Sequence, residues 1–326
     1  MELVVEPIEP AAIRAAHVTI DPAFLGSPQF VHDGLSARAG RPVIVKVETV
    51  NPIRSFKGRG TWHAVSGLVG EGSVNANRPL VVASTGNFGQ GVAYAARAFG
   101  VPVTVFADEG ANRRKLDRIR ALGATVRQAG HDFDAAREAA EAHARTTGAH
   151  LLVDGQDARI AVGAGTLVVE VTDAVEAGAL PLPGTAYVPV GNGALIVGVG
   201  AWLRATAPGC RVVGIQSEAA PSMTLSWRER RPIETETVAT FADGIASRVP
   251  VPEALAWMAD TVDDMRLVSE ASLRLAQGEL GDALGITVEG AAAASWAGVL
   301  ADRDPDPGPA LVIVTGSNVP AAPDAA

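Results

Sequence analysis

Short β-branched runs alternate with longer segments of helical period along most of this chain, and that alternation is typical of parallel βαβ units. The first series begins near Leu80. Its strands are predicted over 80–83, 101–106, 124–128 and 151–153, with helices over 88–98, 113–122 and 133–145. Four strands and three helices in this order predict one compact, open α/β unit.

A second series follows and predicts a second sheet. Its helices are expected over 160–174, 195–205, 252–258, 270–284 and 288–301, and its strands over 186–190, 211–215 and 311–314. The strand over 311–314 is apolar throughout, so we expect it to be central in its sheet, with both faces covered. With 326 residues the chain is also long enough for two domains.

Composition limits the partners. The chain has 27 Lys and Arg residues against 36 Asp and Glu, a formal net charge of −9. Such a balance repels phosphate backbones and anionic membranes, so we expect no nucleic-acid or membrane partner and a small-molecule substrate instead. Cys210 is the single cysteine, which excludes an intrachain disulfide and a cysteine-based metal cluster. The segment Met1 to Pro7 lacks the pattern of a secretory signal, and a cytoplasmic location is expected.

Lys57 is the most informative residue. It stands beside Phe56 between small residues and follows an apolar stretch, so we expect it at a strand end inside a cleft. Removal from water favours the neutral amine, which is the nucleophile that forms a Schiff base with a carbonyl group. The alternative is an ordinary solvated surface charge.

Three further segments follow predicted strands and resemble anion-binding turns. Ser84–Gln90 and Gly191–Leu195 each join a strand to a helix, where unpaired N–H groups and the positive end of the helix dipole meet. Thr315–Asn318 ends the last buried strand, at the sheet edge where open α/β folds bind ligands. Each segment alone is also compatible with plain turn chemistry.

Taken in order, these segments closely resemble the fold-type II pyridoxal-phosphate enzymes of the tryptophan synthase β-subunit superfamily, and within it the serine/threonine ammonia-lyase and serine racemase branch. The family pattern of an acidic residue, Asn-Pro and Ser-Phe-Lys-x-Arg-Gly is matched by Glu48, Asn51-Pro52 and Ser55–Gly60. The resemblance covers nearly the whole chain. Its other blocks are 84–90, 115–124, 163–166, 191–195, 242–246 and 315–318.

The resemblance implies a fold and a division into domains. The expected fold class is α/β, with two open, mainly parallel, twisted sheets flanked by helices. A large cofactor-binding domain would comprise residues 1–65 and 153–326. A small α/β domain, residues 66–152, would be inserted in it and close over the substrate.

The resemblance also implies roles for individual residues. Lys57 would hold pyridoxal 5′-phosphate as a Schiff base and act as the catalytic base at the substrate Cα. Ser84, Thr85 and Gly86 would bind the substrate carboxylate. The implied cofactor-binding residues are Phe56, Lys57, Asn87, Gly191, Asn192, Gly193, Ala194, Leu195 and Thr315. Among these, Asn87 would meet the 3′-oxygen, 191–195 the phosphate, and Thr315 the pyridine nitrogen.

Several positions depart from the family pattern. Phe88 stands where a histidine is common, and Asn192 and Ala194 interrupt a run of glycines. Arg54 is either a surface charge or a partner for a second substrate carboxylate. Gln216 replaces an acidic residue that serves a divalent cation in many members, so no metal site is assigned, although Glu218 nearby leaves one open.

The resemblance implies a homodimeric lyase that removes water and ammonia from a small β-hydroxy amino acid, L-threonine or L-serine, to give a 2-oxo acid. Serine racemase, hydroxyaspartate ammonia-lyase and β-replacement synthase are alternatives on the same scaffold. A non-catalytic cofactor-binding protein is the alternative from another class. The basic residues of 113–120 are expected to form a solvated helix face rather than a nucleic-acid site.

Overall fold

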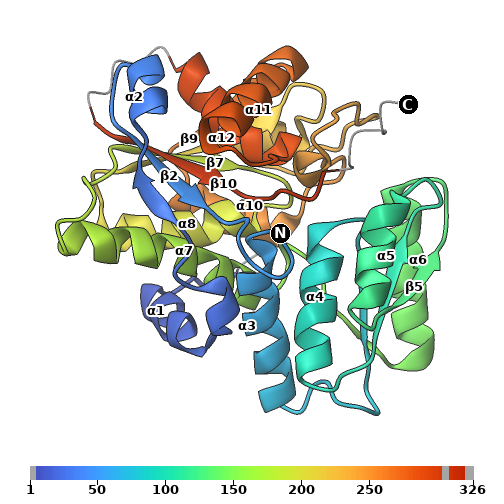
Figure 1. Ribbon diagram of the computed structural model, residues 1–326. Coiled ribbons are helices and arrows are strands. Elements are labelled where there is room, and N and C mark those ends of the chain that lie inside the picture. The colour runs from blue at the N-terminus through green and yellow to red at the C-terminus, as the bar shows by residue number, and fades with distance from the viewer. Residues whose placement is uncertain (1–4, 303–307, 320–326) are drawn as a thin grey trace.

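The computed structural model describes residues 5–302 and 308–319 and contains two sheets flanked by helices, as Figure 1 shows. Residues 1–4, which form part of the segment expected to carry no secretory signal, lie outside this description. The α/β fold class expected from the sequence is confirmed. No helix among the described residues has both the length and the apolar character needed to cross a bilayer.

The larger sheet has six strands in the order β1-β2-β10-β7-β8-β9, and all are parallel except β1. The strand β10 lies between β2 and β7 and is buried along its whole length, so the prediction that it is central is confirmed. The strand bounds are β1 Gln29–Val31, β2 Val43–Val47, β7 Thr185–Pro189, β8 Arg211–Ser217, β9 Asp264–Val268 and β10 Ala310–Val314.

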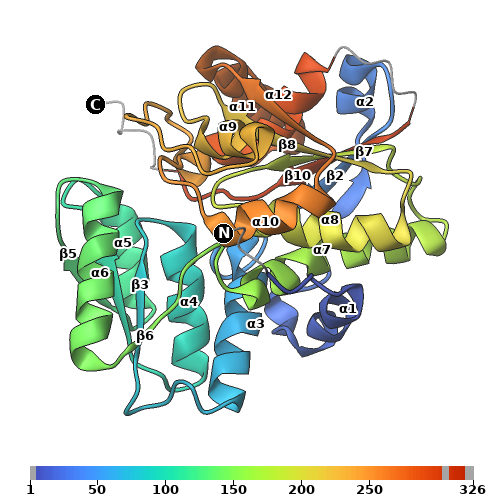
Figure 2. The same cartoon turned by 180° about the vertical axis from the view of Figure 1, so that it is seen from behind.

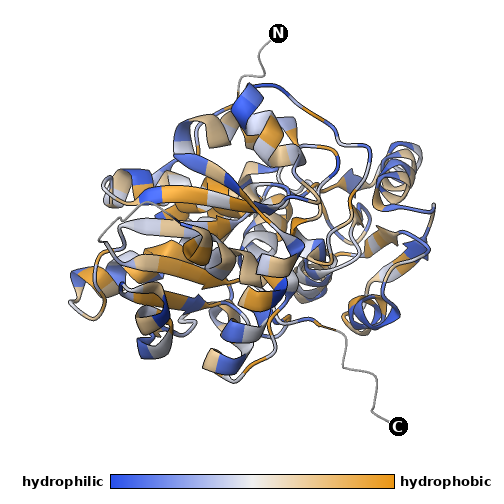
Figure 3. Ribbon diagram, turned by 90° about the horizontal axis from the view of Figure 1, so that it is seen from above, coloured by the Kyte–Doolittle hydropathy of each residue, from blue (hydrophilic) through white to orange (hydrophobic). Residues whose placement is uncertain are grey.

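Helices cover both faces of the larger sheet. The helices α7 (Ala158–Glu176) and α8 (Ala194–Thr206) pack on one face, and α11 (Glu270–Leu284) and α12 (Gly290–Ala301) lie on the other, as Figures 1 and 2 show. Successive β10 residues alternate between the two: Ile313 joins the apolar cluster of α7 and α8, and Val312 and Val314 join that of α12. This double burial explains the apolar strands at the centre of Figure 3.

The smaller sheet has four parallel strands in the order β5-β4-β3-β6. Val81 and Phe106 pack against α6 (Phe133–Thr147), while Leu80 and Val105 face the apolar cluster that includes α4 (Asn87–Ala98) and α5 (Arg113–Ala121). The strand bounds are β3 Leu80–Ala83, β4 Val103–Ala107, β5 Thr125–Gln128 and β6 His150–Leu151. All four strands fall within the predicted insertion, whose boundaries remain a prediction.

Helix α3 (Lys57–Gly70) packs against both α7 of the larger unit and α4 of the smaller one. A Cβ atom on Gly60 would lie 2.5 Å from the carbonyl oxygen of Ile160, so only glycine allows α3 to approach α7 this closely. The position of α3 determines where its first residue, Lys57, enters the space between the two sheets.

The remaining helical segments complete the larger unit. The sequence predicted α10, but it gave no indication of the short segments that precede β2 or of α9. Their bounds are α1 Pro10–Thr19, η1 Pro22–Phe24, α2 Asp33–Ala39, α9 Ser222–Glu229, η2 Asp243–Ile245 and α10 Pro252–Thr261.

Candidate active site

A cavity of about 840 Å³ lies where the carboxyl ends of strands from both sheets meet. Strands β3, β6, β7 and β10 all end at its wall, as the strand-end rule for α/β sheets leads us to expect. Every site residue predicted from the sequence lines this cavity. They are Phe56, Lys57, Ser84, Thr85, Gly86, Asn87, Gly191, Asn192, Gly193, Ala194, Leu195 and Thr315.

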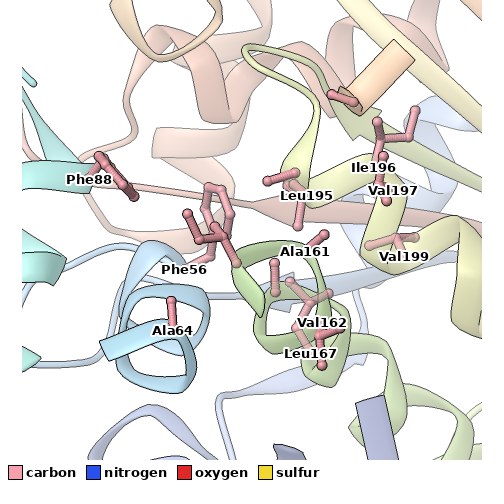
Figure 4. Close-up of a cluster of buried hydrophobic side chains, with 14 of the residues drawn as sticks. Phe56, Ala64, Phe88, Ala161, Val162, Leu167, Leu195, Ile196, Val197 and Val199 are labelled. Atoms are coloured by element: carbon pink, nitrogen blue, oxygen red, sulfur yellow. The ribbon is translucent and has the colours of Figure 1, made fainter. Parts of the chain in front are cut away.

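Lys57 is the first residue of α3, and its side chain is 17% exposed. Its Nζ lies 2.6 Å from Asp154 Oδ2 and 4.8 Å from the centre of the Phe56 ring. Phe56 also belongs to the buried apolar cluster that contains Phe88 and Leu195, labelled in Figure 4. The amine is therefore held between an aromatic face and a carboxylate rather than in bulk solvent.

The turn that leads to Lys57 is fixed by Asn51 and Thr315. Asn51 Oδ1 accepts from the N–H groups of Ile53 at 3.1 Å and Ser55 at 3.2 Å, and its Nδ2 donates to the carbonyl oxygens of Glu48 and Ser55. The Thr315 carbonyl oxygen accepts from Phe56 N at 3.1 Å. These bonds tie the start of α3 to the ends of β2 and β10.

Four buried charged residues, Lys46, Glu48, Arg59 and Glu170, form a cluster that holds α3 in place. Arg59 donates to Glu48 at 2.8 and 2.9 Å and to Glu170 at 2.8 Å, and Lys46 is paired with Glu170. Burial, the largest effect, opposes the charge on Arg59, but Glu48 and Glu170 outweigh it and raise the pKa of Arg59. Burial lowers the pKa of Lys46. The cluster therefore contains two cations and two anions, which offset one another's charge away from bulk water.

The chain contains three lysines, and each has a different environment. Lys46 belongs to the buried charge cluster and does not line the cavity. Lys115 lines the cavity but is paired with Asp243, whose side chain is 56% exposed. Lys57 is the lysine that combines a place in the cavity with a largely buried partner.

The segment 191–195 forms the N-terminal turn of α8. Gly193 has φ +95°, a conformation that favours glycine, and a Cβ on it would lie 2.8 Å from Ala254 Cβ. Among the described residues, none accepts a hydrogen bond from the backbone N–H groups of 191–195. Five free donors at a helix N-terminus suit a phosphate group.

Asn192 and Ala194 are compatible with this turn. Neither residue has a positive φ, and Ala194 is the first residue of α8. The left-handed conformation falls on Gly193 alone, so the turn does not need the tolerance for unusual backbone angles that Asn192 offers.

The segment Ser84–Asn87 joins β3 to α4. Ser84 Oγ accepts from the backbone N–H groups of Gly86 at 3.2 Å and Gly89 at 2.9 Å, so this hydroxyl caps the helix. A Cβ on Gly86 would lie 3.9 Å from Lys115 Nζ. The prediction that 113–120 forms a solvated face is therefore wrong for Lys115, which is buried beside this turn because Asp243 neutralises it.

Asn87 is held by two partners. Its Nδ2 donates to both carboxylate oxygens of Glu289, at 2.9 and 3.1 Å, and its Oδ1 accepts from Asn318 Nδ2 at 2.8 Å. Glu289 is 4% exposed, and burial raises its pKa. The orientation of the Asn87 amide is thus set before any ligand binds.

Asp154 and Glu289 also line the cavity, and neither was predicted from the sequence. Asp154 follows the predicted strand over 151–153, and an acidic residue at that position was a usable signal. Glu289 interrupts a long apolar run just before α12, which is a weaker signal.

Two alternatives left open by the sequence can be compared with the structure. Arg54 is exposed and is not among the residues that line the cavity. Gln216 is buried, and its Oε1 accepts from the N–H and the hydroxyl of Thr224, while Glu218 is exposed. In the described part of the chain, no three His, Cys, Asp or Glu residues are grouped as a metal site requires.

Comparison with known proteins identifies the family of the chain. A family model described as pyridoxal-phosphate dependent enzyme matches residues 20–316. The chain belongs to the pyridoxal-phosphate dependent enzyme family. The family resemblance inferred from the sequence is confirmed, and pyridoxal 5′-phosphate is the cofactor.

Relatives within this family are named as lyases of threonine. The chain is 34% identical to an L-threonine ammonia-lyase of Thermotoga maritima over 285 residues, 87% of this chain and 69% of the relative. It is 32% identical to the biosynthetic L-threonine dehydratase of Mycobacterium tuberculosis over 315 residues, 94% of this chain and 71% of that one.

Solved structures of the family share the fold. The processed form of threonine deaminase isoform 2 from Solanum lycopersicum matches with a TM-score of 0.84 at 26% identity, over 98% of this chain and 89% of the other. Maize serine racemase matches with a TM-score of 0.87 at 23% identity, over 96% and 94%, and this likeness supports the fold alone.

The cavity fits the cofactor. It combines an amine for the carbonyl carbon (Lys57), five free N–H groups for the phosphate (191–195), an aromatic ring (Phe56) and a preset amide (Asn87). Together with Thr315, which also lines the cavity, these groups match in number and chemistry the carbonyl carbon, the phosphate, the ring face, the 3′-oxygen and the pyridine nitrogen of pyridoxal phosphate.

Proposed function

We propose that this protein is a pyridoxal-phosphate dependent ammonia-lyase that acts on a small β-hydroxy amino acid, L-threonine or L-serine, and releases a 2-oxo acid and ammonia. The observation that carries the proposal is the position of Lys57 Nζ inside a cavity whose free backbone donors suit a phosphate. The names of the relatives, which are threonine ammonia-lyases and dehydratases, support the reaction class.

In this proposal the cofactor is held by Lys57, by the N–H groups of 191–195, by the ring of Phe56 and by Asn87. Thr315 lines the cavity at the end of β10, and we assign its hydroxyl to the pyridine nitrogen. A neutral hydroxyl can donate a hydrogen bond to an unprotonated nitrogen, whereas a carboxylate would favour its protonation. An unprotonated pyridine nitrogen withdraws electrons less strongly, so negative charge at the substrate Cα is better discharged at once by loss of the β-substituent.

The substrate carboxylate is assigned to the turn of Ser84, Thr85 and Gly86. The N-terminus of α4 lies directly behind this turn, and Lys115 Nζ lies beside Gly86. The helix dipole favours an anion there. The turn orients the substrate so that its Cα hydrogen faces Lys57.

The bound cofactor supplies electron withdrawal from the substrate Cα, which makes its proton acidic. Lys57, once its amine is free, removes this proton. In net terms, the Cα proton and the β-hydroxyl are lost as one water molecule, and hydrolysis of the resulting enamine takes up one water and gives the 2-oxo acid and ammonia. Phe56, Phe88 and Leu195 exclude bulk water from one wall of the cavity.

The test is incubation of the purified protein with L-threonine, L-serine and 3-hydroxyaspartate, followed by 2-oxo-acid and chiral amino-acid analysis. We expect 2-oxobutyrate from threonine and pyruvate from serine, with D-serine formed more slowly than pyruvate. Lys57→Ala should abolish turnover, whereas Arg114→Ala, at an exposed position of α5, should retain it. D-serine as the main product would replace this proposal by the racemase alternative, and no turnover by a cofactor-loaded protein would favour the non-catalytic one.

We extend the proposal to a homodimer in the cytoplasm. Cys210 is the single cysteine and is buried, so the chain forms no intrachain disulfide, which agrees with a reducing compartment. Light scattering of the purified protein would give its mass in solution, and a mass near 33.4 kDa would contradict the dimer.

A further inference from the structure

Asp154 is the acidic residue nearest to the reacting amine. Its Oδ2 is bonded to Lys57 Nζ at 2.6 Å, and its side chain is 11% exposed. Its second oxygen, Oδ1, is buried and has no hydrogen-bond partner among the described residues. A carboxylate oxygen without a partner in a partly closed cavity is costly, so a cationic or hydrogen-bonding ligand is favoured beside it.

The backbone around Asp154 is fixed. Asp154 lies in the loop between β6 and α7, and the next residue, Gly155, has φ +86°. A Cβ on Gly155 would collide with the carbonyl oxygen of Asn192, so this loop packs directly on the 191–195 turn. The backbone that carries Asp154 is therefore held against the turn assigned to the phosphate.

The cations of the cavity already have partners. Lys57 faces Asp154, Lys115 is bonded to Asp243, and Asp134 pairs with both Arg137 at 3.3 Å and Arg248 at 2.5 Å. Against these four cations the described cavity wall carries seven acidic residues: Asp108, Asp132, Asp134, Asp154, Glu236, Asp243 and Glu289. An anionic side chain on the substrate would find no unpaired cation there.

We infer that Asp154 determines the substrate class by charge: the site accepts amino acids whose side chain is neutral or cationic and rejects those whose side chain carries a carboxylate. The inference rests on the proposed function in one respect, because that function places the Cα of a bound amino acid beside Lys57. A base must come within about 3 Å of the proton it removes. The β-substituent then lies within a few ångström of the carboxylate that contacts Lys57.

The test is equilibrium binding to the cofactor-loaded protein of three amino acids that carry no β-leaving group. L-asparagine and L-aspartate have the same shape and differ in charge, and L-2,4-diaminobutyrate places an ammonium at a similar distance. Binding is measured by calorimetry and by the change in the cofactor absorption band. We expect L-aspartate to bind at least about tenfold more weakly than L-asparagine, as a like charge within about 6 Å predicts, and L-2,4-diaminobutyrate to bind at least as tightly as L-asparagine.

Asp154→Asn removes the charge and keeps the shape, so it should reduce the difference between aspartate and asparagine to threefold or less. Glu236→Gln is the matched control, because it removes one negative charge from an exposed part of the same cavity wall and should keep the tenfold difference. Cofactor content and thermal unfolding verify that Asp154→Asn is folded, and Asp154→Ser replaces it if it is not.

Two results would overturn the inference: aspartate and asparagine binding to the wild type within threefold of each other, or the tenfold difference persisting in the Asp154 variant. Neither result would contradict the proposed function, which is tested separately by turnover of L-threonine and L-serine. Loss of that turnover together with the expected binding order would reject the lyase and leave the charge selectivity in place.

Discussion

The buried charge cluster beneath α3 gives the sharpest stability prediction. Arg59 lies two residues after Lys57, is fully buried, and joins Glu48 at the end of β2 to Glu170 on α7. Replacing it with methionine leaves two buried carboxylates facing Lys46 alone. One negative charge then has no partner, and breaking a buried pair in this way costs about 3–5 kcal/mol. That is a large share of the roughly 5–15 kcal/mol by which domains are stable.

The assay is urea unfolding of the cofactor-free protein, followed by circular dichroism. Arg59→Met should lower the free energy of unfolding by about 3–5 kcal/mol. The double variant Arg59→Met/Glu48→Gln restores the charge balance and should recover at least about 1 kcal/mol. Arg97→Met, at an exposed position of α4, should change it by less than about 0.5 kcal/mol. A loss below about 1 kcal/mol for Arg59→Met, or a double variant no more stable than the single one, would refute the reasoning.

Two further predictions concern the cavity wall. Burial raises the pKa of Glu289 above the value near 4.5 of an unfolded chain, so the folded state holds an extra proton and stability falls as pH rises above about 4.5, by at most about 1.4 kcal/mol per unit. The Glu289→Gln variant should not show this loss of stability with rising pH. Thermal unfolding of both proteins at several pH values checks the prediction. If stability varied with pH in the same way in both proteins, Glu289 would not titrate as its burial implies. Gly193→Ala places a Cβ 2.8 Å from Ala254 Cβ at φ +95° and should raise the dissociation constant for pyridoxal phosphate at least about tenfold, or 1.4 kcal/mol. Fluorescence titration measures it against Gly278→Ala, where the added Cβ meets nothing within 4 Å, and equal affinities would contradict the assigned phosphate site.

Hydrophobic periodicity predicted most of the framework. The strand over 80–83 and the helix over 270–284 have the bounds of β3 and α11. The apolar run over 311–314 also indicated the central place of β10. These elements bury one face or both, and the spacing of their apolar residues in the sequence indicates this burial.

The sequence was least informative where tertiary contacts override local preference. Helix α3 contains Gly58, Gly60, Gly67 and Gly70, so its sequence has a low helix propensity. Its glycines serve close packing instead, as the contact of Gly60 with Ile160 shows. Strand β9 was missed because Asp264 and Arg266 interrupt its apolar pattern.

In the candidate site, too, local features could be predicted from the sequence, whereas contacts between distant residues could not. Strand ends and glycine-rich turns indicated the segments that line the cavity, because those features are local. The pairings of Lys57 with Asp154 and of Asn87 with Glu289 join residues 97 and 202 positions apart in the chain. Which strand ends meet depends on strand order, and that order cannot be obtained from local patterns.

The central claim is that Lys57 holds the cofactor, and chemical trapping tests it most directly. Borohydride reduction of the cofactor-loaded protein, followed by proteolysis and peptide mass spectrometry, locates the reduced pyridoxyl group among the three lysines of the chain. We expect the modification on Lys57 and none on Lys46, which is fully buried and paired with Glu170. Modification of Lys115 with Lys57 left unmodified would contradict the account.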